Sequence, residues 1–421
     1  MSSFSMKTYQ LLMTGARGTF YPFISIWLLS CGMPPTVVGF ISSIKSFCIT
    51  FFGPTIVAYA DNTKQHMRVT FVCTLVSSLM AALAYFMTLI FPPDGSLGYN
   101  LTMSALLSVM FAFRAPITPL MDGAIMMRLR DEGRPEDYGK IRLYGTIGFG
   151  IAGSLAGFVM ERFGYSSITV LFVVQQLCSI LFLGSLFPSM SNASEKGEKT
   201  GKDEDNVGGK KKKSSYKDMY ESFKKLYREE QGFGLFLLIV LFMGSCKSVI
   251  GTHYTVLLEL NDLPKSVIGI SVGLSTVSEI PLFYFSNVLI RRYGSRSVML
   301  FAQVGMIVRH ALMTVLSGKY LLLPQLLHGV TYALLWSSIV NYVNVIAPPA
   351  YATTTLSLVS VCFNGISSFV SEILSGFVHQ YMGCVALFRI CTVMATISTL
   401  IWAAFLSWTK KEDPKKKKKA E

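Results

Sequence analysis

The chain has 421 residues, of which 51% are hydrophobic and 15% are charged, and its formal net charge is +14. A mean hydropathy of +0.48, with the apolar residues in long blocks, is typical of a helical protein with many membrane spans and not of a soluble domain. The positive charge would indicate nucleic acid in a soluble protein, but its distribution along this chain excludes that interpretation.

Twelve apolar blocks follow one another, six on each side of a long polar segment. Each has about 20 residues or more, enough to cross a bilayer as a helix. They lie near residues 9–30, 36–60, 67–90, 99–127, 142–163, 166–187, 232–258, 266–290, 296–317, 321–346, 353–379 and 383–408. We therefore predict an all-α polytopic membrane protein, with twelve transmembrane helices in two six-helix halves, residues 1–187 and 232–408.

Lysine and arginine crowd the breaks after even-numbered blocks, whereas the breaks after odd-numbered blocks contain almost none. Examples are Lys64 and Arg68 after the second block, and Arg291 and Arg292 after the eighth. By the positive-inside rule, both termini and the central segment are predicted to be cytosolic. The endoplasmic reticulum, the plasma membrane and another endomembrane are alternatives for the membrane in which the chain resides.

The central segment, residues 188–231, has two parts of different composition. Residues 188–215 have almost no apolar side chains and are predicted to be disordered. Residues 216–231 repeat aromatic residues at helical spacing, which predicts an amphipathic helix lying on membrane lipid. A solvated linker helix is the alternative for this second part.

Short phrases recur in the two halves of the chain. LAGFVMERFGY at residues 155–165 is similar to LSGFVHQYMGC at residues 374–384, and the two phrases end the fifth and eleventh blocks. An internal duplication with a site between the halves is the architecture of secondary transporters.

The basic tail, residues 409–421, ends in KKAE. Lys418 and Lys419 lie where a dilysine signal, which coat proteins recognise, would return a membrane protein to the endoplasmic reticulum. A polybasic segment that binds anionic lipid is the alternative.

This layout resembles the major facilitator superfamily, and particular phrases resemble its branch of lactose-type oligosaccharide and nucleoside proton symporters. They are FYPFISIWL in the first block, YGKIRLYGTIGFGIAG in the fifth, SEIPLFYFSNVLIRRYG in the eighth and PQLLHGVTYALLW in the tenth. The chain departs from the superfamily after the second block, where DNTKQHMR keeps Asp61 but lacks the usual arginine and glycine.

The resemblance assigns substrate contact to Asp122 and Arg142, beside the loop between blocks four and five. A carboxylate acceptor and a planar guanidinium donor suit the hydroxyl groups of a solute. A structural ion pair closing that loop is the alternative. Phe149 lies where sugar-transporting relatives stack a tryptophan on the sugar ring, so its presence weakens the prediction of a galactoside.

The resemblance also implies that Glu279, Arg309 and His328, in blocks eight, nine and ten, couple substrate binding to proton movement. Each lies inside an apolar block, where an ionisable group is costly unless it is paired or hydrated. Thr331 replaces the acid that releases the proton in the sugar symporters. Glu279 must then carry the proton and contact the substrate, or the chain is a facilitator or an antiporter.

Lys247 and Glu372 are predicted to form a structural charge pair between blocks seven and eleven. The eight cysteines show no paired spacing, so we predict neither a metal site nor disulfides.

The sequence thus predicts a secondary active transporter of a small polar solute, a sugar, nucleoside or organic acid, that works by alternating access. No cofactor is expected, and a transmembrane proton gradient is the expected energy source. A receptor or scaffold that keeps the fold without transport is the alternative. The sequence shows no nucleophile constellation or phosphate loop, so we do not expect an enzyme.

Overall fold

The computed structural model describes residues 2–91, 95–134, 137–186, 232–347 and 352–412, and every regular element within them is helical. The first half contains α1 (Ser2–Phe20), α2 (Ile24–Ser30), α3 (Pro35–Phe47), η1 (Cys48–Phe52), α4 (Gly53–Thr63), α5 (His66–Ile90), α6 (Leu97–Arg114), α7 (Ile117–Asp131), α8 (Tyr138–Phe163) and α9 (Ser167–Leu186). The second half contains α12 (Phe233–Glu259), α13 (Lys265–Tyr293), α14 (Ser295–Val315), η3 (Gly318–Leu327), η4 (Val330–Leu334), α15 (Leu335–Ile346), α16 (Ala352–Ser360), η5 (Val361–Ile366), α17 (Ser367–Met382) and α18 (Cys384–Glu412). The predictions for residues 188–231 and for Lys418 and Lys419 lie outside the described residues.

Within the described ranges, ten helical stretches are long and apolar enough to cross a membrane. The remaining two predicted spans are α9, whose apolar part Ser167–Leu183 is shorter, and the first block, which a turn divides into α1 and α2. The all-α, multi-span architecture predicted from the sequence is therefore confirmed.

The chain divides into two compact units. The first unit comprises Met1–Ile24 and Cys48–Asp218, and the second comprises Ser25–Phe47 and Met219–Glu421. The division differs from the predicted halves because α2 and α3 belong to the second unit. Helix α3 packs on α17 there at Gly39 and Gly376, and a Cβ on either glycine would collide with the facing backbone.

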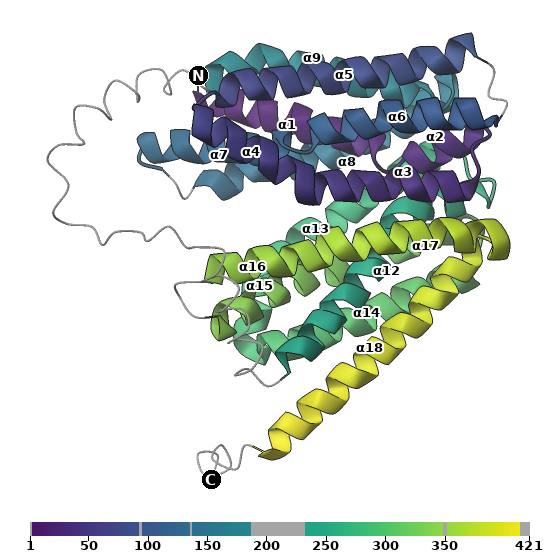
Figure 1. Ribbon diagram of the computed structural model, residues 1–421. Helices are drawn as coiled ribbons and strands as arrows, with labels where there is room; N and C mark the ends of the chain where they lie inside the picture. The colour runs from purple at the N-terminus through teal and green to yellow at the C-terminus, as the bar shows by residue number, and fades with distance from the viewer. Residues whose placement is uncertain (1, 92–94, 135–136, 187–231, 348–351, 413–421) are drawn as a thin grey trace, which may run out of the picture. The chain divides into compact units, whose positions relative to one another are not determined.

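In the first unit, α1 packs on α8 and α9, and α5 packs on α6 and α9 (Figure 1). The contact between α1 and α8 is close because glycines meet there. A Cβ on Gly18 would collide with the backbone of Phe149, and a Cβ on Gly148 would collide with the backbone of Leu11. Small residues at such crossings let helix backbones approach inside a membrane.

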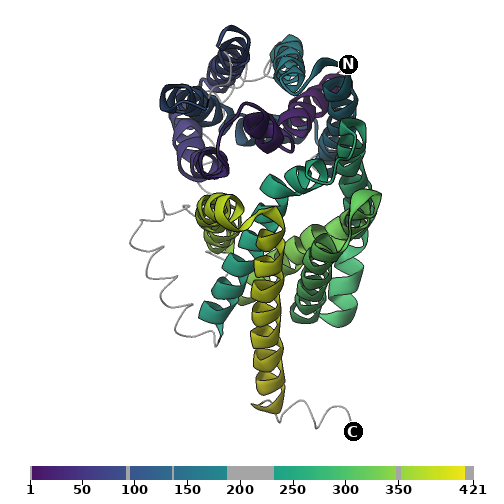
Figure 2. The same ribbon diagram turned by 90° about the vertical axis from the view of Figure 1, so that its right-hand side faces the viewer.

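In the second unit, α12 packs on α17 and α18, and α14 also packs on α18. Helix α18 is continuous (Figure 2), whereas three stretches among the described residues widen locally into π-helix. These are η1 in the first unit and η4 and η5 in the second. π-Helical turns interrupt the regular hydrogen-bond ladder and are common at functional sites, and polar residues described below lie on or beside all three.

Candidate functional site

A chain of three polar side chains lies in the second unit. The Glu279 Oε2 atom, on α13, is 3.4 Å from Nε2 of His328. The Nη1 atom of Arg309, on α14, is 3.1 Å from Nδ1 of the same imidazole. The structure thus brings together the three residues to which the resemblance gives proton coupling.

The two contacts of His328 define its tautomer. A guanidinium has only donors, so Arg309 donates and the Nδ1 atom of His328 accepts. The proton of the neutral imidazole is then on Nε2, which faces the carboxylate of Glu279. His328 therefore links a positive group to a negative one without being charged itself.

Arg309 is 2% exposed and is held by neutral acceptors. Its Nη1 atom donates to Oγ1 of Thr331 at 2.8 Å, and its Nη2 atom donates to Oε1 of Gln325 at 2.7 Å. Within the described residues no carboxylate forms an ion pair with Arg309. Thr331, at the position where the resemblance implies an acid, therefore supplies a hydrogen bond in place of a charge, and Glu279 is the acid of this chain of side chains.

The backbone brings α13 close to the tenth span at this point. His328 lies between η3 and η4, and Thr331 lies within η4. Ser278, beside Glu279, donates its hydroxyl to the Gln325 carbonyl at 3.1 Å and accepts the Gly329 amide at 3.3 Å. Only glycine fits at 329, because a Cβ there would collide with the Ser278 carbonyl oxygen. The irregular tenth span thus sets the distance between Glu279 and His328.

Lys247 and Glu372, predicted to form a pair, have different direct partners. The Lys247 Nζ atom donates to Oδ1 of Asn364 at 2.6 Å and lies over the rings of Phe363 and Tyr332, at 4.9 and 5.7 Å from the ring centroids. Asn364 and Phe363 belong to η5. Lys247 is therefore stabilised by an amide and by aromatic faces.

Glu372, 2% exposed, instead forms an ion pair with Lys45 of α3, whose Nζ atom is 3.4 Å from Oε1. Ser46 donates to Oε2 at 2.7 Å, and Ser248 donates to Oε1 at 3.0 Å. The difference from the prediction has a physical cause. The glycine contact between α3 and α17 brings a second lysine close to this carboxylate, and no local pattern in the sequence predicts that packing.

Asp122 and Arg142 form an ion pair between α7 and α8 in the first unit. The Arg142 Nη1 atom is 2.9 Å from Oδ2 of Asp122 and 3.4 Å from the Tyr138 hydroxyl. The Arg142 side chain is 54% exposed. Phe149, seven residues further along α8, is half-buried and packs its backbone against Gly18. An exposed guanidinium suits both the solute contact and the alternative loop-closing ion pair.

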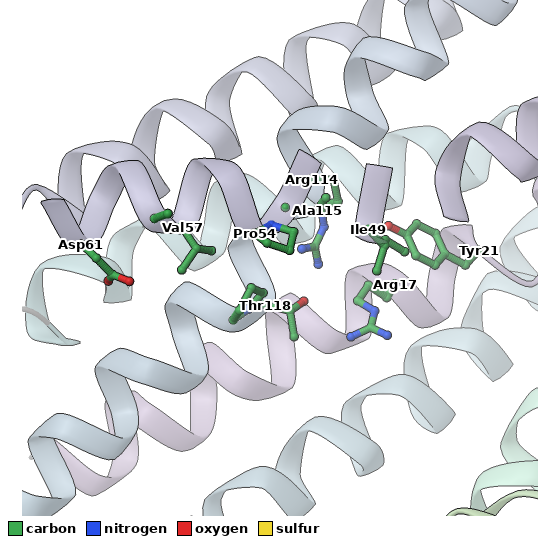
Figure 3. Close-up of a pocket in the computed structure, with 12 residues that line it drawn as sticks. Arg17, Tyr21, Ile49, Pro54, Val57, Asp61, Arg114, Ala115 and Thr118 are labelled. Carbon is green, nitrogen blue, oxygen red and sulfur yellow. The ribbon is translucent and has the colours of Figure 1, made fainter. Parts of the chain in front are cut away.

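A cavity of about 480 Å³ opens in the first unit among α1, η1, α4, α6 and α7 (Figure 3). Its wall contains two arginines, Arg17 and Arg114, together with Tyr21 and several apolar side chains. Both arginines lie inside apolar blocks of the sequence. They come together through side-chain contacts between α1 and α6, such as the Arg114 hydrogen bond to the Met13 carbonyl, which no local sequence signal predicts.

Three side chains of the second unit also gather in a way that the sequence did not predict. Cys246, His310 and Cys391 come from α12, α14 and α18, and their ligand atoms lie within 4.8 Å of one another. The His310 ring donates from Nδ1 to the Met306 carbonyl at 2.9 Å, which leaves its Nε2 lone pair toward the cluster. The Cys246 thiol donates to the Cys391 carbonyl at 3.6 Å. Ligand spacing along the chain could not predict this cluster, because each member lies on a different helix.

Comparison with known proteins places the chain among membrane transporters. The model of the MFS_1-like family matches residues 3–390. An uncharacterised transporter of Bacillus subtilis, YwbF, is 23% identical over 394 residues, covering 93% of this chain and 90% of that protein. A probable 3-phenylpropionic acid transporter of Escherichia coli is 25% identical over 372 residues, covering 87% and 88%.

A solved structure shows the same fold. The crystal structure of the nucleoside transporter NupG superposes with a TM-score of 0.78 at 18% identity. The superposition covers 97% of this chain and 99% of that one.

Proposed function

Because the chain belongs to the MFS_1-like family of the major facilitator superfamily, we propose that it is a secondary active transporter of a small polar solute. In this proposal the solute crosses the membrane by alternating access. The relatives act on an organic acid and on nucleosides, as their names state, which supports these two classes of solute beside the sugars.

The observation that carries the proposed coupling is the chain from Glu279 through His328 to Arg309. The Glu279 carboxylate binds one proton, becomes neutral and later releases that proton to the opposite side. Arg309 stabilises the charged carboxylate through the neutral imidazole, so a movement that separates Arg309 from His328 favours proton uptake. His328 keeps its own proton on Nε2 while Arg309 occupies Nδ1. A proton gradient is thus the proposed energy source, and no cofactor is required.

The orientation in the proposal follows the positive-inside rule, with both termini in the cytosol. The two charge pairs, Arg142 with Asp122 and Lys45 with Glu372, have different roles in it. The exposed pair contacts the solute, and the buried pair stabilises the second unit. Lys247 is a structural group that holds η5 against α12 through Asn364.

The test is uptake into proteoliposomes of the purified chain under an imposed pH gradient. Radiolabelled 3-phenylpropionate, uridine and xylose represent the three classes of solute. We expect one class to accumulate against its gradient, and Glu279→Gln to abolish accumulation while solute exchange continues. Asp262→Asn is the matched control, since Asp262 lies at a helix end with a positive φ of 54° that asparagine tolerates. Wild-type protein that moves none of the three would favour the scaffold.

A further inference from the structure

The first-unit cavity has a composition that suits one kind of ligand. Its volume of about 480 Å³ lies in the usual range for small-molecule sites. Ile49, Pro54, Val57 and Pro119 supply apolar walls, and Tyr21 supplies an aromatic one. A ligand that fills this space must therefore carry an apolar or aromatic body.

Arg114 is 2% exposed at the end of α6, directly before the Ala115–Pro116 break. Its Nη2 atom donates to the Met13 carbonyl at 2.9 Å, and its Nε–H is buried without a partner. A buried guanidinium with a free donor is costly unless another group satisfies it. The single carbonyl fixes the direction of the side chain and leaves its charge unneutralised.

Arg17, on α1, is the second guanidinium of the cavity and is less constrained. Within the described residues no hydrogen bond, ring contact or ion pair reaches its side chain. Asp61 also lines the cavity, but Figure 3 places it at the opposite end from the two arginines. Its Oδ1 atom is 3.6 Å from Nε2 of His66. The two arginines therefore share one end of the cavity with no acid beside them.

Three spans are irregular where they border this end. The first span turns at Tyr21 between α1 and α2, the second widens at η1, and the fourth breaks at Pro116 between α6 and α7. Non-helical backbone at membrane depth persists only where it is buried in protein or lines a cavity. The coincidence of three interruptions at one cavity points to a binding site and argues against a packing defect.

We propose that this cavity binds the carboxylate of an organic monoanion with an apolar or aromatic body, through Arg17 and Arg114. Two positive and one negative formal charge in the lining leave one positive charge, which a monocarboxylate neutralises. Both guanidiniums offer paired donors that match a carboxylate. The inference rests on the proposed transport function only in taking this cavity as part of the solute route, and it narrows the solute to organic anions.

The test is binding to the purified full-length chain by calorimetry, so that it does not depend on transport. The probes are sodium phenylacetate, its neutral isostere phenylacetamide, and sodium chloride at the same ionic strength. We expect phenylacetate to bind and the amide and chloride to have no comparable effect. Arg17→Gln should weaken phenylacetate binding at least about tenfold, the loss expected for a charge-assisted hydrogen bond.

Arg17→Gln is preferred to a change at Arg114, because within the described part of the chain it removes no hydrogen bond or ion pair of the Arg17 side chain. Arg162→Gln, an exposed arginine at the end of α8, is the matched control and should bind phenylacetate as the wild type does. Arg17→Lys should give an intermediate affinity, since it keeps the charge but loses the planar fork.

The inference is overturned if phenylacetamide or chloride binds as well as phenylacetate, or if Arg17→Gln binds phenylacetate unchanged. These outcomes are separate from failure of the transport proposal. Phenylacetate that binds through Arg17 but never crosses the membrane would contradict transport alone. Uridine or xylose that accumulates through Glu279, with no carboxylate bound, would contradict the anion site alone.

Discussion

The buried charges of the second unit and the two cavity arginines of the first unit differ in how many direct partners they have. In the second unit each buried charge has direct partners: Glu372 has Lys45 and Ser46, and Arg309 has Gln325 and Thr331. In the first unit the two cavity arginines have one carbonyl between them. An unpaired cation in low dielectric is destabilising, so its retention points to a ligand. The Nε–H of Arg309 is also buried without a partner, but three other polar contacts hold this guanidinium. We conclude that the charges with several direct partners stabilise and couple, whereas the cavity arginines bind a ligand.

The comparison predicts first that removing a charge with several direct partners strongly lowers the free energy of unfolding. Glu372→Ala removes the buried carboxylate that forms an ion pair with Lys45 and accepts hydrogen bonds from Ser46 and Ser248, and we expect the free energy of unfolding to fall by about 3–5 kcal/mol. Reversible unfolding in mixed micelles measures this loss. Asp131→Ala, at the exposed end of α7, is the control and should change the free energy by less than about 0.5 kcal/mol.

The same assay decides which lysine is the partner of Glu372. A double-mutant cycle should give a larger coupling energy between Glu372 and Lys45 than between Glu372 and Lys247, because only Lys45 forms an ion pair with the carboxylate. A larger coupling with Lys247 would restore the pair predicted from the sequence and contradict the packing of α3 on α17.

A smaller effect is expected where backbone geometry, not charge, maintains the second-unit network. Gly329→Ala inserts a Cβ against the Ser278 carbonyl and separates α13 from the tenth span. We expect a loss of about 1–3 kcal/mol, the usual cost of overpacking, together with weakened proton-driven uptake. Gly251→Ala is the matched control, since nothing lies near its added Cβ. Equal stability and uptake of the two variants would show that the close approach is unimportant.

The smallest effect should come from removing an unsatisfied charge. Arg17→Gln ends the repulsion between two cations and breaks no hydrogen bond, so unfolding should change by less than about 0.5 kcal/mol or become harder. Arg114→Gln, which loses the Met13 carbonyl contact, should cost more than Arg17→Gln does. If Arg17→Gln were as destabilising as Glu372→Ala, the contrast between the units would fail.

The sequence predicted the fold well because apolar blocks and basic breaks are local signals. It also marked Glu279, Arg309 and His328, since ionisable residues inside apolar blocks stand out and their spans follow one another along the chain. The distances among them depend on the irregular tenth span. Neither Pro324 nor His328 by itself predicts a π-helical turn at η4.

Contacts between helices that are far apart along the chain could not be predicted from the sequence. The partner of Glu372 comes from α3, far away in the chain, and depends on two glycines that no periodicity connects. The shared cavity of Arg17 and Arg114 could not be predicted from the sequence either, because the two arginines line it at a place where three spans are interrupted. A list of intramembrane charges identifies such residues but does not say which remain without a partner.

The central claim is that Glu279 couples transport to proton movement and that Arg17 binds the solute. The most direct test of this claim compares two kinds of flux in the same proteoliposomes. Accumulation of radiolabelled phenylacetate under a pH gradient requires both binding and coupling, whereas exchange of labelled for unlabelled phenylacetate requires binding alone. The account predicts that Glu279→Gln loses accumulation and keeps exchange, and that Arg17→Gln loses both. Glu279→Gln protein that still accumulates phenylacetate, or Arg17→Gln protein that still exchanges it at the wild-type rate, would contradict the account.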